Sequence, residues 1–189
     1  MALTHDQVSI LLAPETEANW QQKAEIIKRI KDDKVKINQE IIKGITLSIK
    51  SERTRLARAS MDLCLYIDSN IDLLLPVILN NCAKANNVYV SCALNTLVSL
   101  IDKGVPNLVL SLLPALSSIN KVFRQSAALL LVHLIKSTCS NDLLSRSLLF
   151  ESCVSLAIQD KDDLVRKSGR DAFSLLSKMI NLDSFLFLI

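Results

Sequence analysis

Apolar residues recur every three or four positions along most of the chain, and short polar segments separate these stretches. One clear stripe consists of four isoleucines at four-residue spacing, Ile37, Ile41, Ile45 and Ile49. This spacing places the side chains on one face of an amphipathic helix. With only 3 Gly and 4 Pro, the chain has few residues for the tight turns of a sheet protein. The pattern therefore predicts an all-α protein.

The helices and polar turns return together at an interval of 34 residues. Two sets of positions fall into register across three copies: the small residues Ala59, Ala93 and Ala127, and the positions Leu56, Val90 and Arg124. A fourth copy follows after a longer gap, where Gly169 takes the small position and Arg166 matches Arg124. One helix pair cannot bury its own apolar face and must stack on its neighbours. The repeat therefore predicts a helical-repeat solenoid.

Five helix pairs account for the pattern and predict a single domain over residues 1–189. The pairs are expected at about 4–31, 34–68, 71–101, 105–136 and 142–180, with residues 182–189 read as the remnant of a further repeat. Thr4 is the expected cap of a first helix over about 4–12.

Three later segments are each expected to form one continuous helix, at about 51–68, 71–83 and 142–158. Pro76 and Pro114 fall within or near the ends of apolar helices. Because proline lacks a backbone N–H and disfavours helix at the preceding residue, we expect each to kink or shorten its helix.

The charge pattern limits the classes of partner. The formal net charge is +3, and nucleic-acid binding requires a concentrated basic face, so no nucleic-acid partner is expected. Residues 1–60 contain 11 Lys and Arg against 8 Asp and Glu, residues 61–120 contain 2 against 4, and residues 121–189 contain 9 against 7. The positive charge therefore lies toward both ends of the chain.

The five cysteines show no CxxC spacing, and most lie in apolar helical stretches. We interpret them as reduced core thiols of an intracellular protein and expect no metal and no cofactor. No apolar stretch reaches the roughly 20 residues of a membrane-spanning helix, and residues 1–12 lack the basic start of a signal peptide. The expected location is the cytosol or nucleus, with no membrane partner.

Charged and amide side chains gather in the turn that leads into the second helix of each pair. The residues concerned are Lys50, Glu52, Arg53 and Arg55, then Lys84, Asn86 and Asn87, then Asn120, Lys121 and Arg124, then Lys161, Arg166 and Lys167. Stacked repeats place such turns in one row, and a row of cations suits an extended acidic protein surface. The alternative is that these residues only keep the turns soluble.

Several segments resemble a TOG domain of the CLASP family over nearly the whole chain. They are Glu15 to Trp20, Ser51 to Ala59, Asn120 to Ala127 and Asp160 to Lys167. The resemblance implies a flat paddle of HEAT repeats whose turns bind tubulin. TOG domains commonly have six HEAT repeats, and five can be traced here.

The resemblance also implies roles for individual residues. An aromatic side chain in the first turn of such domains packs on tubulin, and basic residues in later turns contact its acidic surface. The matching positions are Trp20 for the aromatic residue, and Lys50, Arg53, Lys84, Lys121, Arg124, Arg166 and Lys167 for the basic residues. An alternative for Trp20 is that it covers the end of the solenoid core.

The resemblance favours a microtubule-associated, tubulin-binding module that stabilises microtubules or regulates their dynamics. Its expected setting is the cytoplasm, cytoskeleton and mitotic spindle, with other spindle or kinetochore proteins as further partners. The alternative is a HEAT-repeat scaffold that binds a non-tubulin protein. An enzyme is not expected, because His5 and His133 are the only histidines and no catalytic triad or phosphate-binding loop is visible.

Overall fold

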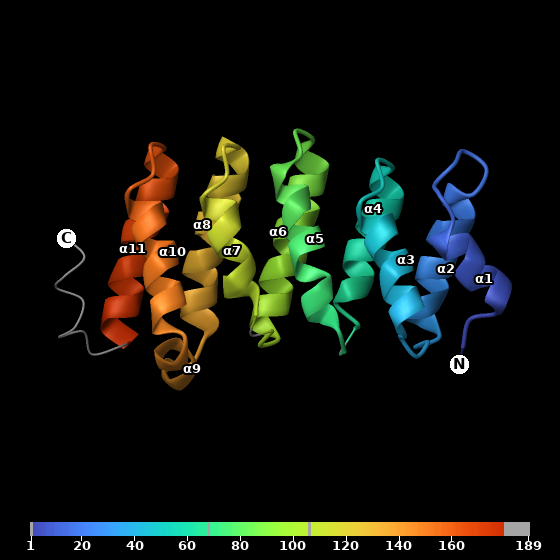
Figure 1. The fold of residues 1–189 in the computed structure, drawn as a ribbon, viewed down its shortest axis with the longest axis horizontal. Coiled ribbons are helices and arrows are strands. Elements are labelled where there is room, and N and C mark those ends of the chain that lie inside the picture. The colour runs from blue at the N-terminus through green and yellow to red at the C-terminus, as the bar shows by residue number, and fades with distance from the viewer. Residues whose placement is uncertain (1, 68, 106, 180–189) are drawn as a thin grey trace. The chain divides into compact units, whose positions relative to one another are not determined.

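The computed structural model describes residues 2–67, 69–105 and 107–179, and all regular secondary structure in these ranges is helical (Figure 1). The all-α prediction is confirmed for this part of the chain. The chain divides into two compact units, Met1–Thr96 (unit 1) and Leu97–Ile189 (unit 2). The prediction of a single domain over 1–189 stays a prediction, and the 182–189 segment lies outside the described residues.

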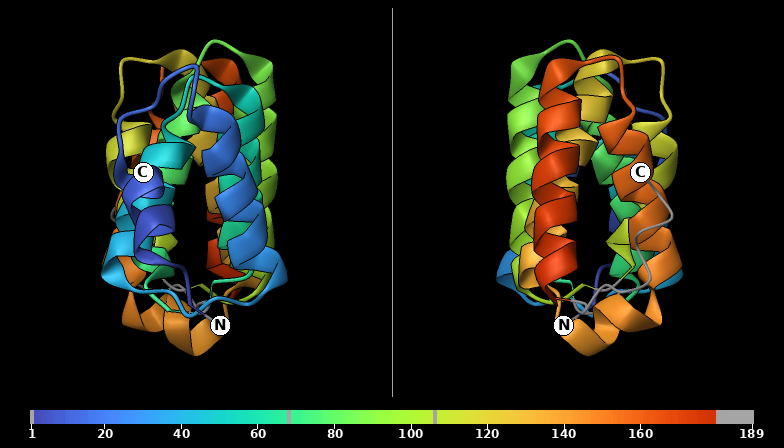
Figure 2. Two further views of the ribbon diagram at one scale, coloured as in Figure 1. Left: turned by 90° about the vertical axis from the view of Figure 1, so that its right-hand side faces the viewer. Right: turned by 90° about the vertical axis from the view of Figure 1, so that its left-hand side faces the viewer.

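Unit 1 consists of helix pairs, and most of their helices pack on the corresponding helix of the next pair. Its elements are α1 (His5–Leu12), α2 (Trp20–Asp32), α3 (Gln39–Ile49), α4 (Thr54–Cys64), η1 (Ile71–Leu73), α5 (Leu75–Asn80), η2 (Asn81–Ala83) and the first part of α6 (Asn87–Asp102). The first helices α1, α3 and α5 contact one another in order, and α2 contacts α4. The end view shows α1 and α3 on one side of this unit and α2 and α4 on the other (Figure 2, left).

Unit 2 repeats the arrangement with longer second helices. After the last part of α6 it contains α7 (Leu108–Leu116), α8 (Lys121–Ser137), α9 (Ser140–Ser145), α10 (Ser147–Ile158) and α11 (Asp163–Met179). The first helices α7 and α10 contact each other, and so do the second helices α8 and α11 (Figure 2, right). The short helix α9 packs on α10.

The isoleucine stripe lies in the core of unit 1, as its spacing predicted. Ile41, Ile45 and Ile49 are buried along α3, whereas Ile37 is half-buried and precedes the helix. Asn38 begins α3, because its side-chain oxygen accepts a hydrogen bond from the Ile41 N–H at 2.9 Å. Thr4 caps α1 in the same way and forms a capping box with Gln7, so the predicted start of the first helix is confirmed.

The predicted small-residue register holds for three of its four positions. Ala93 and Ala127 are fully buried, and Gly169 lies so close to α10 that an added Cβ would be 2.6 Å from the Ile158 nitrogen. Ala59 is only half-buried, and its neighbour Ser60 occupies the fully buried position instead. The predicted register is therefore wrong for α4. Its buried face is shifted by one residue along the sequence, from Ala59 to Ser60, relative to the other repeats.

The predicted helix over 51–68 is also too long. Ser51 belongs to the turn before α4, where its hydroxyl accepts a hydrogen bond from the Arg53 N–H at 2.9 Å. At the other end, Leu65 and Tyr66 donate backbone bonds to residues three positions earlier. Such bonds tighten the last turn and end the regular helix at Cys64.

Two predicted helices are divided. Pro76 lies in the first turn of α5, where its missing N–H is tolerated, and short 3₁₀ turns flank the helix on both sides. The 71–83 segment is therefore three short elements. The 142–158 segment is divided into α9 and α10 at Arg146, whose φ of −124° and ψ of 20° lie outside the helical region. Pro114 stands inside α7, near its C-terminal end.

The cysteines differ in exposure. Cys64, Cys82 and Cys153 are buried, Cys92 is half-buried and Cys139 is exposed. Burial raises the pKa of the Cys153 thiol to about 12, so this group stays protonated at neutral pH. Within the described ranges, no helix is both long enough and apolar enough to cross a membrane.

Candidate protein-binding site

The turn between α1 and α2 is held by its own hydrogen bonds. The Asn19 side chain accepts from the Thr16 N–H at 2.8 Å and donates to the Pro14 carbonyl at 2.8 Å. Lys23 is buried one turn into α2, and its ammonium donates to the carbonyls of Leu11, at 3.2 Å, and Ala13. These carbonyls lie at the C-terminal end of α1, so the cation interacts favourably with the negative end of the helix dipole. The turn is thereby fixed at the start of α2, where Trp20 lies.

Trp20 is half-buried at the first position of α2. The Arg53 guanidinium, from the turn between α3 and α4, lies 5.7 Å from the centroid of the Trp20 ring. This distance is within the range of a cation–π contact. The aromatic residue and the basic residue of two successive turns, both predicted from the resemblance, therefore contact each other.

The basic residues of unit 1 reach back to acidic residues of the preceding turn. Arg53 forms an ion pair with Glu17 of the first turn. Lys84 pairs with Glu52 of the second turn at 3.2 Å and also donates to the Ser51 carbonyl at 3.4 Å. These three turns lie at the same end of unit 1 in Figure 1. The predicted cations of Arg53 and Lys84 thus already have partners within the unit.

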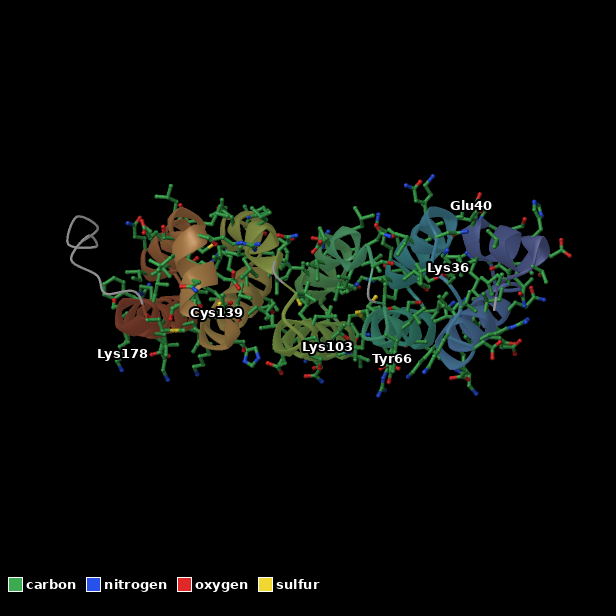
Figure 3. The ribbon with its side chains drawn as sticks, turned by 90° about the horizontal axis from the view of Figure 1, so that it is seen from below. Lys36, Glu40, Tyr66, Lys103, Cys139 and Lys178 are labelled. Carbon is green, nitrogen blue, oxygen red and sulfur yellow. The ribbon has the colours of Figure 1, made fainter. Side chains whose placement is uncertain are left out.

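The opposite end of unit 1 has a separate link between α2 and α4. Lys31 of α2 lies 2.7 Å from the Asp62 carboxylate and 4.4 Å from the centroid of the Tyr66 ring. Figure 3 shows Tyr66 in the view from this end. The hydrogen bond to Asp62 raises the pKa of Lys31. Both ends of the α2–α4 contact are therefore fixed by charged groups.

Unit 2 has a buried version of the bridge between turns. Arg124, in the first turn of α8, donates from Nε to Asp160 Oδ2 at 2.6 Å and from Nη2 to Asp160 Oδ1 at 3.2 Å. It also donates to the carbonyls of Ser118, at 2.9 Å, and Ile119, at 3.1 Å. The side chains of Arg124 and Asp160 are 5% and 7% exposed. The expectation that Arg124 faces a partner is therefore wrong, because its donors are used internally.

A second bridge in unit 2 lies nearer the surface. Lys121 of α8 lies 2.8 Å from Asp162, and Gln125 donates to the same carboxylate at 3.0 Å. Asp162 also accepts from the Leu164 and Val165 N–H groups and so caps α11. Arg166 donates to the Asp160 carbonyl at 2.8 Å and pairs with Asp163.

These contacts set the protonation of the two aspartates. Burial alone would raise the pKa of Asp160, but hydrogen bonds from Arg124 and the Asp162 backbone outweigh burial and hold the pKa below its ordinary value. The hydrogen bonds from Lys121 and Gln125 lower the pKa of Asp162 further. Both carboxylates are therefore charged at neutral pH.

Two of the predicted cations remain available to a partner. Lys50 and Lys167 are exposed, and neither takes part in an ion pair among the described residues. Lys121 keeps 64% of its side-chain surface exposed although it contacts Asp162. The structure places Lys50, Arg53 and Lys84 in the turns of unit 1, and Trp20 is the first residue of α2. In unit 2, Lys121 and Arg124 lie near the start of α8, and Arg166 and Lys167 lie near the start of α11.

Two grooves run beside α4 in unit 1. The α2–α4 groove has a volume of about 360 Å³ and is lined by Trp20, Gln21, Ala24, Glu25, Lys28, Arg55 and Ala59. The α4–α6 groove has about the same volume, 360 Å³, and is lined by Arg58, Asn87, Val88, Ser91, Cys92 and Asn95. Trp20 therefore stands where the first turn meets the α2–α4 groove.

The acidic partners of the turn cations were missed from the sequence. Arg53 and Glu17 are 36 residues apart, Lys84 and Glu52 are 32 apart, and Arg124 and Asp160 are 36 apart. These separations are close to the repeat interval, because stacked repeats bring equivalent turns together. Searching for opposite charges within two residues of that interval would have found each pair.

No protein family model matches the chain, and no curated protein is significantly similar to it. The resemblance to TOG domains rests on the residues and motifs quoted from the sequence.

Proposed function

We propose that the chain is a HEAT-type, TOG-like module that binds tubulin or microtubules without catalysing a reaction. Its effect would be to stabilise microtubules or regulate their dynamics, in the cytoskeleton and at the spindle. The contact of like helices within each unit supports a helical-repeat solenoid, since stacked pairs bury a continuous core.

One observation carries the proposal: a half-buried tryptophan at the start of α2 contacts Arg53 of the next turn, and the same turn carries the exposed Lys50, which forms no ion pair among the described residues. Trp20 is held by a rigid turn and by the Arg53 guanidinium, and Lys50 is free to meet an acidic surface. Tryptophan and arginine side chains, here Trp20 and Arg53, contribute most of the binding energy of many protein interfaces. In unit 2, the exposed Lys167 and the largely exposed Lys121 would form a second set of partner contacts, beside Arg166, which already pairs with Asp163.

Co-sedimentation with microtubules tests the proposal. Replacing a central aromatic contact commonly costs at least about 2 kcal/mol, so Trp20→Ala should weaken binding by more than about tenfold. Lys50→Glu should weaken binding by a smaller factor that decreases at high salt. Lys43→Glu is the matched control, because Lys43 is an exposed lysine within α3 and away from the turns.

Circular dichroism and thermal denaturation establish that each variant is folded before binding is measured. If the folded Trp20→Ala and Lys50→Glu proteins bind microtubules as tightly as wild type, the turns of unit 1 are not the binding site. If Lys50→Glu and Lys43→Glu lose the same microtubule affinity, binding depends only on the net charge of the protein.

A scaffold that binds a non-tubulin protein is the second candidate. The observation in its favour is the internal pairing of Arg53, Lys84 and Arg124, which leaves fewer free cations on the turns than the sequence indicated. Wild-type protein that fails to sediment with microtubules, yet remains folded, would favour this candidate.

A further inference from the structure

The arginines of α4 differ from most other arginines of the chain. Arg29, Arg53, Arg124 and Arg166 all take part in ion pairs. Arg55 and Arg58 are exposed and form no ion pair with the described residues. They lie three positions apart, so their side chains are neighbours on one face of α4. This face belongs to α4 itself and begins directly after the α3–α4 turn, to which the sequence pattern had assigned Arg55.

Each of these arginines lines a different groove. Arg55 lines the α2–α4 groove, and Arg58 lines the α4–α6 groove. A volume of about 360 Å³ is at the lower end of the range of about 300–1,000 Å³ typical of ligand pockets. Ala24 and Ala59 line the first groove beside Trp20, and Val88 is half exposed along the second. Each groove is therefore suited to apolar side chains rather than to a large cofactor.

The charge of the lining residues favours an acidic occupant. The charged side chains that line the two grooves are Lys28, Arg55 and Arg58 against the single acid Glu25, a balance of three cations to one anion. Arginine binds carboxylates with two parallel hydrogen bonds, and an exposed arginine without a partner keeps all its donors free for that purpose.

We propose that the face of α4, together with its two flanking grooves, binds an acidic amphipathic helix of a partner protein. Apolar residues of that helix enter the grooves on either side of α4, and its carboxylates contact Arg55 and Arg58. Acidic residues three or four positions apart on a helix match the spacing of the two arginines. This is the helix-in-groove mode of recognition, with the charged pairs giving register and specificity. The proposed surface shares Trp20 with the proposed tubulin-binding residues, and it also includes Arg55 and Asn87, which the sequence pattern grouped with the turns.

Fluorescence anisotropy with two synthetic peptides tests this inference on the full chain. One probe is a labelled amphipathic helix with leucines along one face and glutamates beside them. The other has glutamine in place of each glutamate. We expect the acidic peptide to bind more tightly, and Arg55→Glu/Arg58→Glu to lose at least about tenfold of that affinity. Arg170→Glu is the matched control, because Arg170 is an exposed arginine on α11 in unit 2.

A second variant separates the grooves from the charge. Ser91 is exposed and lines the α4–α6 groove, so Ser91→Trp should fill the groove without disturbing the core. We expect weaker binding of both peptides to this variant. Four outcomes would overturn the proposal: no binding of the acidic peptide, equal losses for Arg55→Glu/Arg58→Glu and Arg170→Glu, an unchanged affinity in Ser91→Trp, or tighter binding of a single-stranded RNA oligonucleotide through the same arginines.

Discussion

The turn cations of the two units have similar side chains in different electrostatic settings. In unit 1, the side chain of Arg53 is 41% exposed and that of its partner Glu17 is 79% exposed. In unit 2, Arg124 and Asp160 form a bidentate pair that is almost completely buried. An exposed pair is screened by water and salt, whereas a buried pair is not. A basic residue that recurs at equivalent turns can therefore be a surface contact in one repeat and part of the core in another.

The largest expected effect comes from breaking the buried pair. Arg124→Ala leaves Asp160 charged and without its partner, and such a change typically costs about 3–5 kcal/mol. Urea denaturation should show a lower free energy of unfolding by that amount. The double variant Arg124→Met/Asp160→Leu should recover much of the loss, since no unpaired charge remains. A loss below about 1 kcal/mol in Arg124→Ala would mean that the pair behaves like the exposed pair of unit 1.

Packing gives a second contrast between the units. In Gly169→Ala the new Cβ would meet the backbone of Ala157 and Ile158 in unit 2, which cannot move out of the way easily. We expect a cost of about 1–3 kcal/mol, partly offset by the better helix propensity of alanine. The comparison variant Gly44→Ala in unit 1 meets Cγ of the fully buried Leu11 side chain, so we expect a cost of similar size that depends on how far Leu11 can shift. Equal melting temperatures for Gly169→Ala and wild type would contradict the close α10–α11 approach.

Acid should destabilise unit 2 through its aspartates. The pKa values of Asp160 and Asp162 are lower in the folded state than their ordinary value of about 3.9. Their contribution to stability is therefore complete above that value and is lost as the pH falls toward the folded-state pKa. Asp162→Asn keeps a capping side chain and removes one of the two titrations.

Urea midpoints measured from about pH 5 down to about pH 2 would show this dependence. The loss of stability should be shallower in Asp162→Asn than in wild type. Parallel curves for the two proteins would argue against a bound, charged Asp162 in the folded state.

The smallest expected effect belongs to the exposed pair. Arg53→Ala removes the ion pair with Glu17 and the contact with the Trp20 ring. Because the side chains are exposed, we expect a loss of about 0–1 kcal/mol that decreases at high salt. Thermal denaturation at low and high ionic strength measures the difference. A salt-independent loss above about 2 kcal/mol would place Arg53 in the same class as Arg124.

The helices were predictable because periodicity in the sequence reflects burial on one face. Thr4 and the isoleucines of α3 illustrate this, since a cap and an apolar stripe depend only on local sequence. The ends of α4 and the break at Arg146 depend on backbone hydrogen bonds within single turns, which the apolar pattern does not contain. The rotation of α4 that buries Ser60 depends on packing against neighbouring helices.

The candidate site was predictable in its location but not in its charges. The repeat placed Arg124 in register with Leu56, and both side chains are buried even though the small-residue register fails at Ala59 of the same helix. The charge of arginine suggested the surface instead. Its burial requires Asp160 from the next turn, so the two residues had to be considered together. Lys50 and Lys167 lie on the predicted turns and have no such partner among the described residues.

The buried ammonium of Lys23 can be used to measure how often α1 and α2 separate locally. It is the only buried lysine in the described part of the chain, and its donors are occupied by the end of α1. Burial lowers the pKa of Lys23, although Glu15 opposes that shift. A lower pKa favours the neutral, reactive amine, so burial of the side chain, and not its charge, is what keeps an acetylating reagent from Lys23. An amine-acetylating reagent should modify the exposed lysines first. The rate at which Lys23 is acetylated would then measure how often α1 detaches from α2 in the otherwise folded protein.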